Sequence, residues 1–179
     1  AFRRCAEIEL FARSPWYLAG GTALALQVGH RQSVDLDFFI PHKSFPEITV
    51  ETELFAEEDW HTSFRDRGTI YGILLGAKMS LIAYPFFIPS DTRIQYGTVS
   101  ILTASDIASM KIVAISQRGR KRDFIDLYWH CINREPLRDT VERALKAYPG
   151  QERNSHHILK SLTYFADAEA DPMPRLFFD

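Results

Sequence analysis

The spacing of hydrophobic residues in the first part of the chain predicts one strand between two helices. Residues 3–13 have helical spacing, and residues 16–19 form a short apolar run typical of a strand. Residues 22–28 are small and apolar with helical character, and Gly29 is suited to end that helix. The strand and the second helix are joined directly by Gly20 and Gly21.

A second strand is predicted at Val34–Ile40, where polar and apolar residues alternate until Pro41. Side chains two positions apart on a strand point the same way, about 6–7 Å apart. We therefore expect Asp35 and Asp37 to place two carboxylates on one face.

Further strands and then helices are expected along the rest of the chain. A helix-like segment near residues 46–58 precedes strand candidates at 60–65, 69–75 and 78–84, with a turn at Gly76-Ala77. Helices are expected from a cap at Ser105 to Gly119, over 121–133, from Pro136 to about Tyr148, and over 153–167, with an irregular tail after Asp171. This change from mixed strands and helices to helices alone predicts an α/β (α+β) fold, with a core at residues 1–103 and a helical region at 104–179 packed on it.

Composition adds a few restrictions. The chain has 179 residues, 46% of them hydrophobic, and its two cysteines, Cys5 and Cys131, lie too far apart in sequence for a CxxC zinc motif. No apolar run is long enough to span a membrane and no signal peptide is recognisable, so we expect a protein of the reducing cytoplasm. Residue 1 is Ala rather than Met, so the chain is treated as a possible fragment.

The balance of charge argues against general attraction to nucleic acid. The formal net charge is −2, so RNA binding would need a local basic patch. One such stretch contains Arg118, Arg120, Lys121 and Arg122, which could contact an RNA backbone or form a solvated turn.

The strongest candidate chemistry lies between Gly20 and Asp37. Two carboxylates on one face repel each other unless a cation lies between them, and oxygen ligands of this kind suit magnesium or manganese. Gly20 and Gly21 stand before a helix N-terminus, where free backbone N–H groups favour a phosphate. Thr22 or Ser33 could add a hydroxyl donor, and Arg31 is expected to pair with a phosphate or with the two aspartates. Each feature alone is common, but their order is much more specific.

These residues carry a resemblance to a known family. The run Leu18-Ala-Gly-Gly-Thr-Ala-Leu-Ala-Leu, followed by His30-Arg-Gln-Ser-Val-Asp-Leu-Asp-Phe-Phe, resembles the first motif of AbiEii/AbiGii-type nucleotidyltransferases, which are similar to polymerase-β-like enzymes. The resemblance implies a mixed sheet flanked by helices. It also implies that Asp35 and Asp37 bind Mg²⁺ and that Gly20, Gly21 and Thr22 lie near a nucleoside triphosphate.

A second stretch resembles the same family. It runs Lys111-Ile-Val-Ala-Ile-Ser-Gln-Arg-Gly-Arg-Lys-Arg-Asp-Phe-Ile-Asp-Leu-Tyr, and Asp123 and Asp126 share one face of its second helix. The resemblance implies that Lys111 contacts the triphosphate and that Asp123 or Asp126 orients it or the catalytic site. Read without the resemblance, two aspartates near a helix start simply complement the helix dipole.

One part of the superfamily pattern is missing. Nucleotidyl transfer commonly uses two metals held by three carboxylates, yet no Asp or Glu occurs between Asp66 and Asp91, and Ser80 stands where the third acid is expected. The missing acid has three possible consequences. The protein could use a single metal ion, or a metal ion together with the substrate; it could take its general base from the helical half; or it could bind a nucleotide without transferring it.

The sequence therefore favours two functions. The first is a magnesium-dependent nucleotidyltransferase that, by the resemblance, is the toxin of a bacterial toxin-antitoxin or phage-defence (abortive infection) pair. It would transfer a nucleoside monophosphate from a triphosphate to a hydroxyl of RNA, such as tRNA, or of a protein, and a cognate antitoxin would be its partner. The second is a non-catalytic nucleotide or RNA binder on the same scaffold, and a plain interaction domain is a third reading.

The remaining polar and aromatic residues predict less. His30 and His42 flank the first motif, and we expect them to be exposed polar side chains. An aromatic set is expected to pack in the core rather than to stack on a base: Tyr84, Phe86, Phe87, Tyr128 and Trp129.

Overall fold

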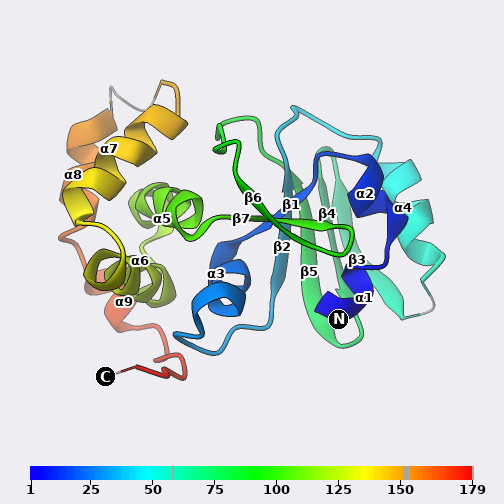
Figure 1. Ribbon diagram of the computed structural model, residues 1–179, viewed down its shortest axis with the longest axis horizontal. Coiled ribbons are helices and arrows are strands. Elements are labelled where there is room, and N and C mark those ends of the chain that lie inside the picture. The colour runs from blue at the N-terminus through cyan, green and yellow to red at the C-terminus, as the bar shows by residue number, and fades with distance from the viewer. Residues whose placement is uncertain (58, 151–153, 179) are drawn as a thin grey trace.

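A computed structural model describes residues 1–57, 59–150 and 154–178 of the chain (Figure 1). In this part of the chain one mixed sheet lies between two layers of helices. The strands are β1 (Tyr17–Ala19), β2 (Leu36–Ile40), β3 (Trp60–Asp66), β4 (Thr69–Leu74), β5 (Ala77–Ala83), β6 (Arg93–Tyr96) and β7 (Val99–Leu102). The helices are α1 (Phe2–Cys5), α2 (Glu9–Arg13), α3 (Gly20–Val28), α4 (Glu47–Phe55), α5 (Ala104–Arg118), α6 (Lys121–Asn133), α7 (Leu137–Ala147), α8 (Ser155–Ser161) and α9 (Ala166–Glu169).

The seven strands have the order β3-β4-β5-β2-β1-β7-β6. The central strand β2 pairs antiparallel with β1 and parallel with β5, and β1 pairs parallel with β7. The outer pairs are antiparallel. The sheet is therefore mixed, as the family resemblance implied, and β2, which contains Asp37 and directly follows Asp35, lies near its middle.

Helices cover both faces of the sheet. In Figure 1 helices α1, α2 and α4 lie on one side, whereas α3 and α5 lie on the other, with the remaining helices beyond α5. Alternation along β2 sorts its side chains between these layers: Phe38 is buried and stacks on Phe11 of α2, with ring centroids 4.2 Å apart. Asp37 and Phe39 consequently face α5, on the side where the site forms.

The helical half has a small core of its own. Ile112 and Ile115 of α5 pack with Leu127 of α6, Val141 and Ala144 of α7 and Ile158 of α8. Buried apolar side chains hold α5 between this cluster and the main core, in which Ile107 and Val113 take part. Helix α5 is thus fixed on two sides. The division of the chain into a core at residues 1–103 and a helical region at 104–179 remains a prediction.

Several local predictions about the N-terminal half were wrong in detail. The helix expected over residues 3–13 is two short helices, because Thr98 takes the carbonyls of Ala6 and Cys5: its N–H donates to Ala6 O at 2.9 Å and its hydroxyl to Cys5 O at 3.1 Å. The turn between β4 and β5 is Leu75-Gly76, both with positive φ, rather than Gly76-Ala77. Strand β2 begins at Leu36, so Asp35 precedes it.

The helical half required corrections as well. Thr103, not Ser105, caps α5 by accepting a hydrogen bond from the Asp106 N–H at 3.2 Å. The helix expected over 153–167 is α8 followed by the short α9, and residue 153 lies outside the described residues. The hairpin β6–β7 was not predicted, because its strands have only four residues each.

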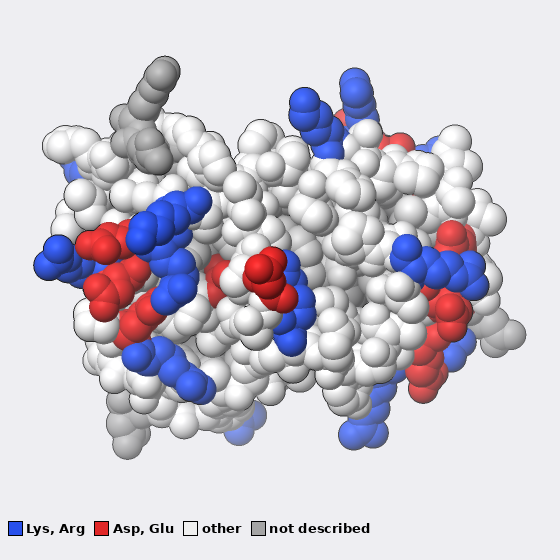
Figure 2. Space-filling model, turned by 45° about the horizontal axis from the view of Figure 1, so that its top comes forward, with Lys and Arg blue, Asp and Glu red and all other residues white. Residues whose placement is uncertain are grey.

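The surface carries both signs of charge. On the face that Figure 2 presents, acidic and basic side chains lie beside one another rather than in separate patches, in keeping with a net charge of −2. No helix within the described residues is long and apolar enough to cross a membrane.

Candidate nucleotide and metal site

A pocket lies between the α5-facing side of the sheet and α5 itself, with a cavity volume of about 210 Å³. Its sheet side contains the segment singled out from sequence, and its helix side contains residues more than seventy positions later. The polar lining consists of Gly20, Gly21, Arg31, Ser33, Asp35, Asp37, Lys111, Gln117, Arg118 and Arg122, and the other end is apolar or aromatic, with Phe39, Ile82, Tyr84, Ile107, Met110, Ala114 and Tyr148. The structure therefore brings the two sequence motifs together.

Neighbouring side chains lie so close to Gly20 and Gly21 that neither position has room for a Cβ atom. Gly20 has a φ of +72°, and a Cβ there would lie 2.7 Å from Asp37 Oδ2. A Cβ on Gly21 would overlap Arg31 Nη2. Both begin α3, whose first N–H groups have no partner within the helix. The first turn of α3 thus offers backbone donors to an anion beside the carboxylate of Asp37.

We predict that Gly20→Ala impairs the site, whereas Gly29→Ala affects mainly stability. Both glycines have positive φ, but nothing lies within 4 Å of a Cβ at Gly29. Each substitution should cost about 1 kcal/mol of folding stability from backbone strain. Only Gly20→Ala should displace Asp37 and reduce nucleotide transfer, by roughly tenfold or more. Thermal unfolding and steady-state transfer rates measured on both variants test this, and equal rates would contradict it.

Asp35 and Asp37 both line the pocket. Asp37 pairs in register with Ser80 of β5, and the Ser80 hydroxyl donates to Asp37 Oδ1 at 2.7 Å. Ser80 is therefore the strand neighbour of Asp37, at the place where the sequence pattern led us to look for a third acid. Asp35 keeps 41% of its side chain exposed, and its nearest cation is Arg122, with Nη1 3.6 Å from Oδ2.

The loop before β2 is fixed by hydroxyl contacts. Thr22 on α3 donates to the backbone carbonyl of Asp35 and lies 2.9 Å from the Ser33 hydroxyl. Thr22 is buried, whereas Ser33 lines the pocket. Thr22 thus holds the loop that carries Asp35, and Ser33 has the position from which a hydroxyl can reach a ligand.

Asp126 lies behind the pocket at the centre of a buried cluster of cations. Arg31 donates to it twice, from Nε to Oδ1 at 2.6 Å and from Nη2 to Oδ2 at 2.9 Å. Lys111 Nζ lies 2.8 Å from Oδ2, and His30 Nε2 lies 2.7 Å from Oδ1. The Asp126 side chain is fully buried. Burial by itself raises the pKa of Asp126, but Lys111, His30 and Arg31 together hold it well below its ordinary value.

Asp123 has a similar role one turn earlier on α6. It accepts from Lys111 Nζ at 2.6 Å and from Arg118 Nε at 3.1 Å, and its side chain is fully buried. Burial opposes the ionised form of Asp123, yet Lys111 and Arg118 lower its pKa overall. Both aspartates are therefore ionised carboxylates that fix the direction of basic side chains.

The cations held in this way still have donors for a ligand. An ammonium has three N–H donors and a guanidinium five, and the two aspartates use only two of those on Lys111. Arg31, Lys111, Arg118 and Arg122 supply as many positive charges as Asp35, Asp37, Asp123 and Asp126 supply negative ones. Because the set is balanced, a bound divalent cation would make the pocket attractive to a triphosphate.

The donor set fits one Mg²⁺ or Mn²⁺ ion held with the help of a substrate. Asp35 and Asp37 are the only carboxylates that line the pocket among the described residues, and no group of three or more His, Cys, Asp or Glu side chains there could hold a metal alone. Mg²⁺ is commonly bound through one or two carboxylates together with waters and substrate phosphates. Two protein oxygens and a phosphate are therefore a suitable set.

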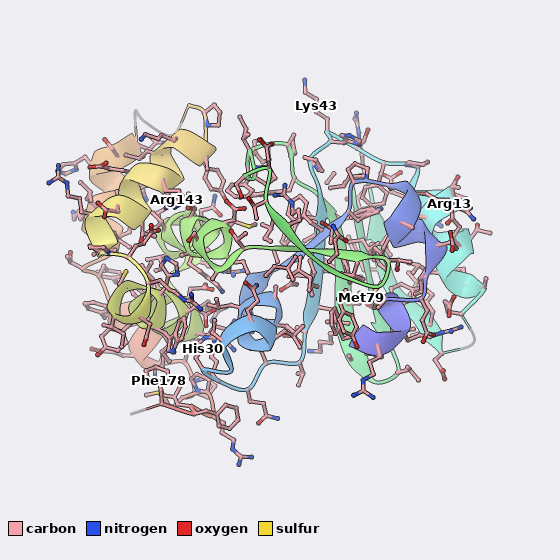
Figure 3. All side chains as sticks on the ribbon, viewed as in Figure 1. Arg13, His30, Lys43, Met79, Arg143 and Phe178 are labelled. Carbon is pink, nitrogen blue, oxygen red and sulfur yellow. The ribbon has the colours of Figure 1, made fainter. Side chains whose placement is uncertain are left out.

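Three expectations about other residues need correction. His30 is 1% exposed and bonded to Asp126 rather than exposed, and Figure 3 shows it between α3 and α6. Arg31 pairs with Asp126 and not with Asp35 or Asp37. Of the aromatic set only Phe87 is buried, since Phe86 and Tyr128 are 66% and 58% exposed and Tyr84 lines the pocket. Burial of a single histidine has no signature in the sequence.

The basic turn is partly engaged with the site. Arg118 bonds Asp123 and Arg122 faces Asp35, whereas Arg120 and Lys121 contact Asp171 in the C-terminal tail. Arg118 and Arg122 therefore belong to the pocket. His42 is exposed, as expected.

The family model described as "Nucleotidyl transferase AbiEii toxin, Type IV TA system" matches residues 6–70 and 82–178. The chain belongs to the AbiEii family. It is accordingly a nucleotidyltransferase of a toxin family, as the first motif suggested. The match leaves out residues 71–81, which include Ser80. The position at which a third acid is expected therefore lies outside the matched residues.

Individual proteins are also similar to this chain. An uncharacterised protein of Aquifex aeolicus (strain VF5) is 35% identical over 169 residues, which cover 92% of this chain and 80% of that protein. JHP933 of Helicobacter pylori has a similar structure, with a TM-score of 0.53, 18% identity, and coverage of 96% of this chain and 82% of that one. The antibiotic-resistance factor ANT(2'')-Ia has a TM-score of 0.58 at 11% identity, with coverage of 88% and 93%. The two structures have the same overall fold as this chain.

Proposed function

We propose that the protein transfers a nucleoside monophosphate from a nucleoside triphosphate to a hydroxyl of an RNA, such as tRNA, or of a protein, with Mg²⁺ or Mn²⁺ bound at Asp35 and Asp37. The observation that carries this proposal is the position of α5, which places Lys111 and Arg118 opposite the first turn of α3 and the two aspartates. Phosphate donors and metal ligands then line a single pocket.

In this proposal the polar end of the pocket binds the triphosphate. The N–H groups of Gly20 and Gly21 and the Ser33 hydroxyl donate to phosphate oxygens, and Arg31, Lys111 and Arg118 neutralise them. A metal bound to Asp35 and Asp37 would stabilise the negative charge that develops on the phosphate oxygens. The acceptor oxygen forms a bond to the α-phosphorus, and pyrophosphate leaves towards the cations.

Asp123 and Asp126 act as positioning residues. They are fully buried and bonded to the basic side chains, so they set the direction of Lys111, Arg31 and Arg118 without touching the substrate. Such supporting contacts typically contribute 10- to 100-fold to the function of the groups they hold. Because both stay ionised and enclosed, the proton of the attacking hydroxyl goes to solvent at the open side of the pocket.

Ser80 gives a direct test of the missing acid. We predict that Ser80→Asp increases transfer by about tenfold at saturating magnesium, because it adds a third carboxylate beside Asp37. The matched control is Ser80→Asn, because asparagine has the shape of aspartate without its charge. This variant should not increase transfer. Initial rates at several magnesium concentrations decide the question. If both variants change the rate equally, a third carboxylate is not what limits this site.

The proposal as a whole is tested by incubating the protein with each labelled triphosphate, magnesium, and either total RNA or candidate proteins. Label should move to one class of acceptor with the wild type, and the double variant Asp35→Ala, Asp37→Ala should transfer none. Full transfer by the double variant, or none by the wild type under all conditions, would overturn the proposal.

The absence of a third carboxylate favours one alternative, a nucleotide or RNA binder without transfer. Calorimetric titration distinguishes the two, since the alternative predicts nucleotide binding by the wild type without turnover. Because the AbiEii family is the toxin half of a type IV toxin-antitoxin system, we also propose a cognate antitoxin as partner.

A further inference from the structure

A groove lies along strand β6, the last strand at one edge of the sheet (Figure 1). This edge groove has a volume of about 620 Å³ and is lined by Ile94–Tyr96 of β6, by Phe2 of α1, by the end of α3, by the start of α5 and by Arg134. Because three consecutive residues of β6 line it, the groove follows the edge of the strand rather than one face. It shares no lining residue with the nucleotide pocket and is therefore a separate site.

The free edge of β6 offers backbone groups that can pair with another strand. Among the described residues β6 pairs only with β7, across the two-residue turn Gly97-Thr98. The pair Tyr96–Val99 beside such a turn exchanges hydrogen bonds, and bonded pairs alternate with non-bonded pairs along an antiparallel ladder. The N–H and C=O groups of Gln95 therefore point away from β7, towards the outer edge.

The opposite edge of the sheet is better protected against such pairing. Strand β3 is interrupted by a bulge between Thr62 and Phe64 and ends in Arg65 and Asp66. Bulges and charges are common devices that keep edge strands from pairing with other chains. In contrast, β6 pairs with β7 without a shift of register, and Ile94–Tyr96 have no charged side chain. The edge of β6 is thus suited to accept a further strand.

The side chains at this edge are apolar on one face. Ile94 and Tyr96 are two positions apart and point to the same face, where Phe2 stacks on Tyr96 with ring centroids 5.0 Å apart. Ile94 and Tyr96 are 42% and 45% exposed, so they have apolar surface left to cover. Neighbours on adjacent strands share a face. A strand added to β6 would therefore need apolar residues at alternate positions.

Arg134 gives the groove a positive charge that is not already neutralised. Among the described residues it is the only Lys, Arg, Asp or Glu in the lining, and it is exposed. Its guanidinium lies 6.0 Å from the centre of the Trp129 ring, and it makes no ion pair in the described part of the chain. An acidic group of a ligand would therefore meet a cation without a competing carboxylate in the lining.

We propose that the edge groove binds an extended segment of a partner protein, which adds a strand to β6 and places an acidic side chain against Arg134. Pairing of backbone groups supplies affinity in such complexes, and the side chains along the edge supply specificity. The segment would have alternating apolar residues followed by Asp or Glu. A second copy of this chain fits less well, because its own β6 would bring Arg93 and no acid.

One test uses a short fluorescent peptide in which valine and threonine alternate before glutamates, and a second peptide that ends in lysines instead. The wild type should bind the glutamate peptide more tightly. Arg134→Glu should weaken binding of the glutamate peptide about tenfold and favour the lysine peptide. The matched control is Arg67→Glu, because Arg67 is an exposed arginine between β3 and β4, at the other edge of the sheet. It should keep the preference of the wild type.

A second pair of variants tests the backbone contact. Gln95→Pro removes the N–H group at the free edge, where an edge strand tolerates proline, whereas Gln95→Ala keeps that group. Gln95→Pro should weaken binding of the glutamate peptide roughly tenfold, and Gln95→Ala should bind it like the wild type. Thermal unfolding checks that both variants are folded, and their nucleotide affinity should equal that of the wild type.

Three results would overturn the proposal: no binding of the glutamate peptide by the wild type, equal affinity for the two peptides, or equal binding by Gln95→Pro and Gln95→Ala. Analytical ultracentrifugation of the protein alone adds a fourth. A dimer that Gln95→Pro dissociates would assign the edge of β6 to a second copy. None of these results bears on nucleotide transfer, which is measured separately at the other site.

Discussion

Replacing Asp126 with alanine is expected to lower the free energy of unfolding by about 3–5 kcal/mol and to abolish tight triphosphate binding. The Asp126 carboxylate is fully buried and bonded to Arg31, Lys111 and His30. Its removal leaves buried positive charge without a partner, and removing one member of a buried ion pair is far more costly than the pair itself is stabilising. The cations would then turn away from the pocket.

Urea unfolding at neutral pH measures the loss of stability, and titration with a triphosphate measures the loss of binding. The matched control is Asp167→Ala, because Asp167 is an exposed acid on the short helix α9. The control should change stability by no more than about 0.5 kcal/mol. If the two variants unfold at the same urea concentration, the buried cluster does not hold the helical half against the sheet.

The same cluster sets the response to acid. The pKa of Asp126 is lower in the folded protein than in the unfolded chain, so this group stabilises the fold above its unfolded pKa of about 3.9, and the contribution disappears as pH falls below that value. Asp123 acts in the same direction. The wild type should therefore become less stable as the pH falls below about 5. The Asp126→Asn variant should lose less stability over the same range.

The second large effect is expected at the metal ligands. Asp35→Asn or Asp37→Asn should reduce transfer by at least about a thousandfold, or roughly 4 kcal/mol in activation free energy, because each removes an ionised oxygen ligand. Folding should persist, since Asp35 is 41% exposed and Asp37 makes a single side-chain hydrogen bond, with Ser80, within the described residues.

Transfer is measured with labelled triphosphate over a range of magnesium concentrations, and folding by circular dichroism. Asp91→Asn is the matched control, because Asp91 is an exposed acid outside the pocket. It should transfer at the wild-type rate. Wild-type rates in both metal-ligand variants would rule out a metal at these two carboxylates and, with it, the proposed mechanism.

Local signals were sufficient to predict much of this molecule. Gly29 with left-handed φ ends α3, and Gly119 ends α5, as their positions in the sequence suggested. Alternating residues predicted β2, and the three strand candidates after it match β3, β4 and β5, all to within one or two positions of their observed ends. These features depend on neighbours in the chain, such as capping residues, turn glycines and periodicity, and are therefore readable in the sequence.

Other features depend on neighbours that are remote in the chain. Thr98 interrupts the N-terminal helix by taking its carbonyls, 93 positions away from Cys5. The register of the parallel pair β2–β5 places Ser80 beside Asp37, 43 positions apart. Sequence spacing indicated that an acid was missing, but pairing between distant strands decided which residue stands in its place.

What the sequence determined by itself is the set of residues: the Gly-Gly turn, the Asp35-Leu36-Asp37 pair of acids, and a later helix pair with Lys111, Asp123 and Asp126. The tertiary structure decided how they are used. Packing of α6 against α5 and α3 encloses Asp123 and Asp126, and an enclosed carboxylate must be paired with cations. That requirement turns Arg31, Lys111 and His30 inward on Asp126, so that the two buried acids fix the direction of basic side chains, among them Arg31 and Lys111 in the lining of the pocket.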